Sequence, residues 1–166
     1  MLRNCLGILG LTTTMLTLPL AALGADPPLS LELSEIAGAR YSQASMPVKV
    51  TLENVSNEPL RVLDSFGERH AHRVFFHLDI KSADGQTSMA AGGGKIDLAP
   101  RSARYIALKG GEKYELTLDL ADLVGDRVKL RSGTYTVTLT YSNQYGEACF
   151  KGSVASKPVQ ITLGDQ

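Results

Sequence analysis

The chain has 166 residues, and 43% of them are hydrophobic, which is enough apolar material for one domain with its own core. Lysine plus arginine and aspartate plus glutamate number 17 each. This balance excludes binding driven by a field of one sign, as in many proteins that bind nucleic acid or anionic membranes. Nucleic acid is therefore not an expected partner.

Residues 1–25 are predicted to be a cleavable signal peptide. Arg3 supplies a short positive start, Cys5–Leu20 is apolar apart from threonines, and a proline leads into small residues, as an export signal requires. Cleavage after Gly24 or Ala25 would leave a domain at residues 26–166, in the periplasm or outside the cell. The alternative is an uncleaved anchor, which four threonines and a proline disfavour. We expect no stable membrane anchor after cleavage.

Cysteine usage points to a domain without an internal disulfide. Removal of the leader would remove Cys5 and leave Cys149 as the single cysteine, so no intramolecular disulfide is expected. A lone cysteine in an exported chain can pair with another molecule. Because Phe150 follows it directly, a buried and inert thiol is the preferred interpretation.

The first part of the expected domain predicts strands separated by turns. Apolar and polar residues alternate from Leu29 to Leu33 and again from Val48 to Leu52, and a period of two indicates half-buried strands. Asn54–Pro59 is rich in turn formers, and a short strand, Leu60–Leu63, follows.

The middle of the chain predicts a hairpin and two further strands. Valine, phenylalanine and isoleucine favour a strand from Arg73 to Lys81, and the pair Asp84-Gly85 suits a hairpin turn after it. Ala90–Gly94 is predicted to be a flexible loop. Tyr105–Leu108 and Lys113–Leu120 are the next expected strands.

The last part contains the clearest strand of the chain. Every second residue from Tyr135 to Tyr141 is apolar and threonines lie between them, which predicts one buried and one solvated face. A final strand, Val159–Leu163, is expected after a polar hairpin or loop at Asn143–Pro158. Ahead of these elements, residues 119–126 (DLADLVGD) predict one helical turn with an aspartate cap and a glycine stop.

Short strands at this spacing, without amphipathic helices for parallel crossovers, must bury their apolar faces against a second sheet. The prediction is therefore an all-β fold, an immunoglobulin-like antiparallel β-sandwich of about seven to nine strands. The spacing of Gly133, Tyr135 and Val137 also fits a tyrosine corner, in which the tyrosine hydroxyl returns to the backbone. Ordinary core packing would place a tyrosine there as well.

Three phrases in order, VKVTLENVSNEPLRVL, ARYIALKGGEKYELTLDLAD and SGTYTVTLTYSN, carry a resemblance to a known family. They resemble the non-catalytic β-sandwich domain that precedes the protease domain of deuterolysin-type (aspzincin, peptidyl-Lys) metalloendopeptidases. The matching positions are turn and core residues, namely Asn54, Ser56, Pro59, Leu60, Tyr105, Leu108, Gly111, Glu112, Leu118, Asp119, Leu120, Gly133, Tyr135 and Val137.

The resemblance implies a fold and not a protease. The zinc proteases of that family need two histidines one helical turn apart with a glutamate beside the first, and this chain has no such spacing. Too few residues follow Asn143 for a catalytic domain. What the resemblance implies is a stand-alone relative of the accessory domain.

All three histidines lie between His70 and His77. On one strand, His70 and His72 would share a face while His77 would point to the other, so the three cannot converge on a metal. Arg69 and Arg73 flank the first two and would repel a cation. Solvated loop histidines are the preferred interpretation, and a periplasmic copper or zinc protein that uses His70 and His72 is the alternative.

Patterns for catalysis are absent from the sequence. No Gly-x-Ser-x-Gly elbow is present, no histidine lies near Cys149, and Ala90–Lys95 lacks the Gly-Lys-Ser/Thr ending of a phosphate loop. No acidic run suggests calcium. We therefore predict no enzyme, no cofactor, and no catalytic, cofactor-binding or metal residues.

The leading hypothesis is an exported, non-catalytic interaction module that binds another protein through a sheet edge or through loops at one end. The loops of interest are Ser65–Arg73, Ala90–Lys95 and Asn143–Ser156. Tyr145 and Phe150 could serve there as aromatic anchors, or they could be ordinary surface or core residues. The alternative is a proteinase inhibitor or an accessory partner of a secreted metalloprotease.

The metal alternative leads to a direct test. We expect no one-to-one binding of Cu²⁺ or Zn²⁺, because two neighbouring histidines supply fewer than the three or four donors of a stable site. Calorimetric titration of the purified protein and of the His70→Ala/His72→Ala double variant checks this. Stoichiometric binding that the double variant loses would contradict the prediction.

Overall fold

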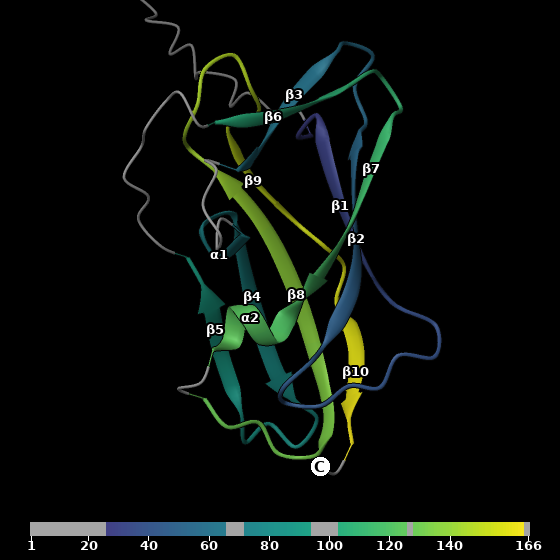
Figure 1. Ribbon diagram of the computed structural model, residues 1–166, viewed down its shortest axis with the longest axis vertical. Helices are drawn as coiled ribbons and strands as arrows, with labels where there is room; N and C mark the ends of the chain where they lie inside the picture. Colours follow the sequence, from purple (N-terminus) through teal and green to yellow (C-terminus); the bar gives the residue numbers. More distant parts are fainter. Residues whose placement is uncertain (1–25, 66–71, 94–102, 126–127, 165–166) are drawn as a thin grey trace, which may run out of the picture.

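The structure is a computed structural model that describes residues 26–65, 72–93, 103–125 and 128–164. The predicted signal peptide at residues 1–25 lies outside the described residues. The described part contains ten strands and two short helices (Figure 1). These are β1 (Leu29–Glu35), β2 (Pro47–Asn54), β3 (Leu60–Ser65), α1 (His72–Phe75), β4 (Phe76–Ser82), β5 (Ser88–Gly92), β6 (Arg104–Leu108), β7 (Lys113–Asp119), α2 (Leu120–Val124), β8 (Gly133–Asn143), β9 (Gly152–Ala155) and β10 (Val159–Leu163).

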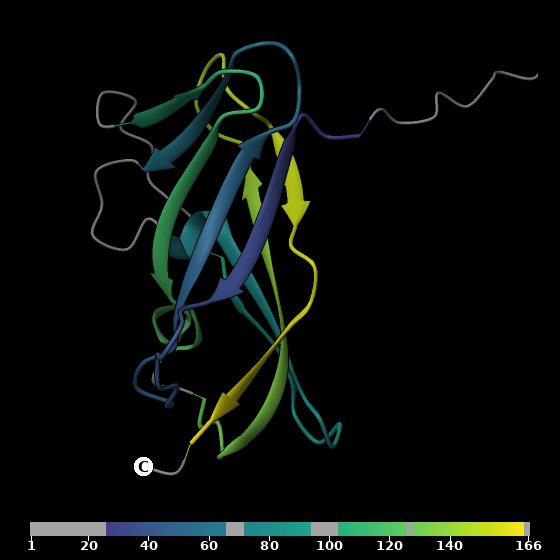
Figure 2. The same ribbon diagram turned by 90° about the vertical axis from the view of Figure 1, so that its right-hand side faces the viewer.

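The strands form an antiparallel β-sandwich, as predicted. One sheet has the order β1-β2-β7 and the other β10-β8-β4-β5, with β9 also paired to β8. Figure 2 shows the two sheets as separate layers. This order matches the A-B-E and G-F-C-C′ arrangement of immunoglobulin-like domains. Strands β3 and β6 form an additional two-stranded ribbon.

Two of the ten strands were not predicted as separate strands, which explains the difference from the expected seven to nine. Strand β5 takes up part of the predicted loop Ala90–Gly94. Strand β9 lies within Asn143–Pro158, where a polar hairpin or loop was predicted, and it forms a hairpin with β8. Both are short and rich in glycine, alanine and serine, so neither has the apolar alternation that identifies a strand in sequence. Pairing with β4 and β8 makes them strands.

The expected strand Arg73–Lys81 was wrong at its beginning. Residues His72–Phe75 form α1, and β4 starts at Phe76. The neighbours Phe75 and Phe76 are both buried, at 1% and 4% exposure, whereas successive strand residues would point to opposite faces. The helical turn lets both rings pack against Tyr141, with centroids 6.2 and 5.5 Å from its ring.

The predicted tyrosine corner is confirmed. The Tyr135 hydroxyl donates a 2.8 Å hydrogen bond to the Arg131 carbonyl and accepts a 3.1 Å bond from the Arg131 N–H. Because the ring of Tyr135 is buried, this pair of bonds attaches the segment ahead of β8 to the core.

The predicted helical turn is also confirmed, as α2. Asp119 is its N-cap, since its carboxylate accepts bonds from the N–H groups of Ala121 (3.0 Å) and Met46 (2.7 Å). Gly125 ends the helix with a φ of 69°, a value that favours glycine.

The tyrosine corner predicts a measurable loss of stability. Tyr135→Phe should lower the free energy of unfolding by about 1 kcal/mol, because both backbone groups of Arg131 lose a partner. Urea unfolding measures this loss. The slope of the free energy of unfolding against urea concentration should stay the same in the variant. Tyr105→Phe is the control and should cost less, because its hydroxyl accepts a single 3.3 Å bond at an exposed site. Equal losses in the two variants would contradict the role of the corner.

Candidate functional site

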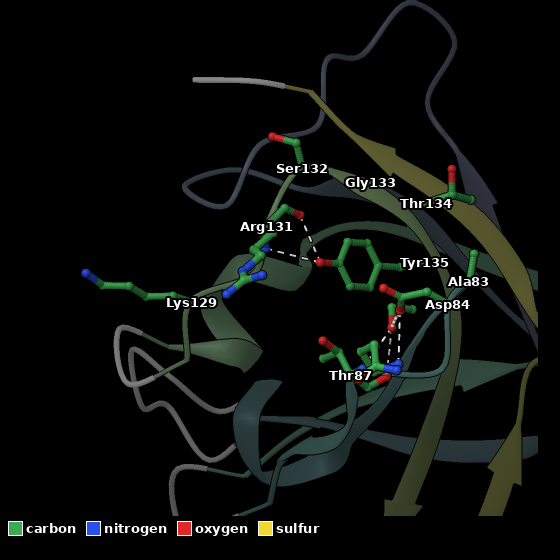
Figure 3. A pocket seen from close by; sticks show the side chains of 11 residues that line it. Ala83, Asp84, Thr87, Lys129, Arg131, Ser132, Gly133, Thr134 and Tyr135 are labelled. Carbon is green, nitrogen blue, oxygen red and sulfur yellow. Dashed lines mark hydrogen bonds between the residues drawn. The ribbon is translucent and has the colours of Figure 1, made fainter.

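A polar cleft opens at one end of the sandwich, and we call it the end cleft. One wall is the turn between β4 and β5, and the other is the segment that leads into β8 (Figure 3). Its volume is about 650 Å³. The lining residues are Ser82, Ala83, Asp84, Gln86, Thr87, Lys129, Arg131, Ser132, Gly133, Thr134 and Tyr135.

The cationic wall consists of Lys129 and Arg131, and the tyrosine corner holds it in place. The Tyr135 hydroxyl binds both backbone groups of Arg131, so the guanidinium starts from a fixed main-chain position. Figure 3 shows the Arg131 side chain directed into the space between the two walls. Both cationic side chains are exposed to solvent.

The facing wall carries the carboxylate of Asp84. Its Oδ1 accepts hydrogen bonds from the Ser82 hydroxyl and from the Gln86 N–H (2.9 Å), while the Thr87 N–H donates to Ser82 Oγ (2.8 Å). The bonds from the Ser82 hydroxyl and then from the Gln86 N–H lower the pKa of Asp84 below its ordinary value, and the charge of Arg131 adds to the effect. Asp84 is therefore an ionised carboxylate at neutral pH.

The charges on the cationic wall are available to a ligand. Within the described residues, the ion pairs are Lys49–Glu115 (2.7 Å), Arg104–Asp64 (3.2 Å) and Lys113–Glu53 (3.3 Å). None of them involves Lys129 or Arg131. Lys129 also borders an adjoining depression, together with Arg73 and Asp122.

A sheet edge adjoins the cleft. Strand β5 begins directly after Thr87, pairs with β4 on one side, and has no partner strand on its other side among the described residues. Figure 1 shows it at the margin of the larger sheet. Ser82 N–H donates to the Thr87 carbonyl, so antiparallel alternation turns the backbone groups of Ser88, Ala90 and Gly92 away from β4.

Of the three histidines, the structure describes the side chain of His77 alone. His70 lies outside the described residues, and His72 is the first residue of α1. His77 is half-buried on β4, on the face opposite to Phe76 and Leu78, as parity predicted. The residues described contain no group of three or more His, Cys, Asp or Glu side chains that could hold a metal. The use of His70 and His72 stays a prediction.

Of the two roles considered for Phe150, the structure excludes the anchor for a partner and confirms the core residue. Its side chain is 5% exposed, and its ring lies 6.2 Å from that of Tyr141 in the core. Tyr145 is half-buried against the same core. Cys149 is half-buried, and its thiol donates to the Tyr145 carbonyl at 3.3 Å. The predicted loop Ser65–Arg73 lies mostly outside the described residues.

The residues of the end cleft were not singled out from the sequence. Asp84-Gly85 was predicted only as a turn, and Lys129 and Arg131 lie in a segment that carries no periodic pattern. A usable signal was present, because a tyrosine corner binds backbone a few residues upstream. That rule identifies Arg131 once Tyr135 is recognised as the corner.

The described residues include no helix that is both long and apolar enough to cross a membrane.

Comparisons with known proteins do not assign a family. No family model and no curated protein matches the chain. Among solved structures, the chain is similar to the crystal structure of a Bacteroides uniformis beta-glucuronidase, with 15% sequence identity and a TM-score of 0.36. The match covers 81% of this chain but only 13% of that one. At this distance it bears on neither family nor activity, and the resemblance to the deuterolysin-type accessory domain stays a prediction.

The turn of the end cleft predicts a specific titration. Ser82→Ala should raise the pKa of Asp84 toward 3.8, because the hydroxyl bond is the main cause of its depression. The ionised carboxylate of Asp84 stabilises the turn at pH values above its ordinary pKa of 3.8. This stabilisation is lost as the pH falls through the lower pKa that Asp84 has in the folded protein. Carboxyl carbon NMR measures both values. The control is Ser88→Ala, which should leave the titration of Asp84 unchanged, and equal shifts in the two variants would contradict the assignment.

Proposed function

We propose that this chain is an exported, non-catalytic immunoglobulin-like module that binds another protein through the end cleft and the adjoining edge of β5. The observation that carries the proposal is the position of the β4–β5 hairpin. Its turn forms one wall of the cleft, and its second strand is the marginal strand of the larger sheet. Two different means of recognising a polypeptide therefore meet at one place.

The β5 edge suits main-chain recognition. An extended segment can add to a free sheet edge by hydrogen bonds with its backbone groups. Charged side chains and proline protect a sheet edge from such pairing. The sequence of β5, Ser-Met-Ala-Ala-Gly, contains neither. The exposed side chains of Ser88 and Ala90 are small, and Gly92 has none, so they would not obstruct an incoming strand.

The charged groups of the cleft suit binding better than proton transfer. A carboxyl whose pKa is lowered, as for Asp84, is a weak proton acceptor at neutral pH. The guanidinium of Arg131 offers N–H donors and has no acceptor atom. Both groups can instead select a partner by charge.

Export is part of the proposal because residues 1–25 have the composition of a signal peptide. A proteinase inhibitor or an accessory partner of a secreted metalloprotease would be one form of the same protein-binding role. Inhibition assays against a panel of secreted proteases separate that form from other partners.

The edge is tested by removing one outward N–H. Ala90→Pro should weaken binding of the partner about tenfold, because the partner loses a backbone donor and meets the proline ring. Ala90→Ser keeps the N–H and is the matched control. Exported proteins of the producing cells are captured on the wild-type chain, and each captured protein is then purified and titrated against all three forms.

Two outcomes would contradict the proposal. One is a captured protein that binds Ala90→Pro as tightly as Ala90→Ser. The other is the absence of any protein retained by the wild-type chain at physiological salt. Urea unfolding of both variants shows whether the proline has changed the fold instead of the edge.

A further inference from the structure

We propose that the end cleft binds a carboxylate group of the partner polypeptide, with Arg131 as the recognition residue. This inference rests on the proposed protein-binding function and names the chemistry of its partner.

Arg131 is prepared for such a contact before a ligand arrives. The buried Tyr135 holds the N–H of Arg131 at 3.1 Å and its carbonyl at 2.8 Å, which removes much of the backbone freedom that binding would otherwise have to restrict. A guanidinium presents parallel N–H donors that match the two oxygens of a carboxylate. A fixed main chain and a bidentate donor together favour a planar anion.

The carboxylate of Asp84 does not occupy this donor. Its Oδ1 accepts from the Ser82 hydroxyl and from the Gln86 N–H within its own turn, and no ion pair within the described residues joins it to Arg131. The lining of the end cleft includes Lys129, Arg131 and Asp84, but Figure 3 shows the Lys129 side chain extending away from the wall that carries Asp84. The guanidinium of Arg131, which takes part in no ion pair within the described residues, is the cationic donor left for an incoming anion.

The same carboxylate argues for a ligand of low charge. A dianionic phosphate would meet about twice the repulsion from Asp84 that a single carboxylate meets. The cleft has a volume of about 650 Å³, and Figure 3 shows the hydroxyl of Thr87 on the wall that faces Arg131. A short peptide segment that bears a carboxylate fits this polar space better than a small dianion.

The carboxylate could come from an acidic side chain or from the end of a chain, and a peptide titration distinguishes them. Three hexapeptides serve as probes. The first has one glutamate after a Gly-Ser repeat and an amidated end, the second is the Gly-Ser repeat with a free carboxyl end, and the third is that repeat amidated. Chemical shifts of the protein's backbone amides report binding at low salt, where charge attraction is least screened.

We expect binding of at least one of the two carboxylate peptides and none of the amidated repeat. Arg131→Gln should weaken binding about tenfold, and Arg131→Lys should recover only part of it, because a lysine lacks the paired donors. Asp84→Asn should tighten binding about threefold, since the amide keeps the oxygen that accepts from Gln86 but removes the like charge. Lys109→Gln, on the turn between β6 and β7, is the matched control and should have no effect.

The affinity for the carboxylate peptides should change in opposite directions, falling in Arg131→Gln and rising in Asp84→Asn. Binding unchanged in Arg131→Gln, or weakened in Asp84→Asn, contradicts it, and so does inorganic phosphate that binds more tightly than either carboxylate peptide. The titration does not depend on β5. Its failure is therefore distinguishable from failure of the proposed function, which the Ala90→Pro comparison detects.

Discussion

The fold depends on burying one face of β8. Its alternate residues Tyr135, Val137, Leu139 and Tyr141 are at most 3% exposed, and each such side chain contributes about 1.5–3 kcal/mol of burial free energy. The strand pairs with β4 on one side and with β9 and β10 on the other. Because these four side chains must be covered, the smaller sheet has to pack across them.

The two tyrosines of β8 also organise opposite ends of the sandwich. Tyr135 binds the backbone of Arg131 at the end cleft, while Tyr141 donates to the Leu63 carbonyl of β3 at 2.8 Å. Burial raises the pKa of Tyr141 far above its ordinary value, so this phenol remains a donor at physiological pH. The same strand therefore anchors the cleft at one end and the β3–β6 ribbon at the other.

The β4–β5 hairpin, whose turn forms one wall of the end cleft, depends on the close approach of the backbones at Gly92 and Phe76. A Cβ at Gly92 would lie 2.2 Å from the Phe76 carbonyl oxygen, and its φ is +87°, so a glycine is required there. This contact brings the end of β5 against the start of β4, directly after α1. The position of the β5 edge thus follows from a glycine in a stretch that the sequence pattern assigned to a loop.

The sequence by itself determined the β-sandwich, the turn at Asp84-Gly85, the helical turn capped by Asp119 and the tyrosine corner. Each of these follows from local rules, because period-two burial, turn chemistry and capping act between residues a few positions apart. Only the tertiary structure decided that Phe75 and Phe76 both enter the core, that β5 and β9 are strands, and that Arg131 faces Asp84 across a cleft. Phe75, Phe76 and Arg131 face partners distant in sequence, which no local pattern shows. Strands β5 and β9 carry too weak a pattern of their own, and they become strands only by pairing with β4 and β8.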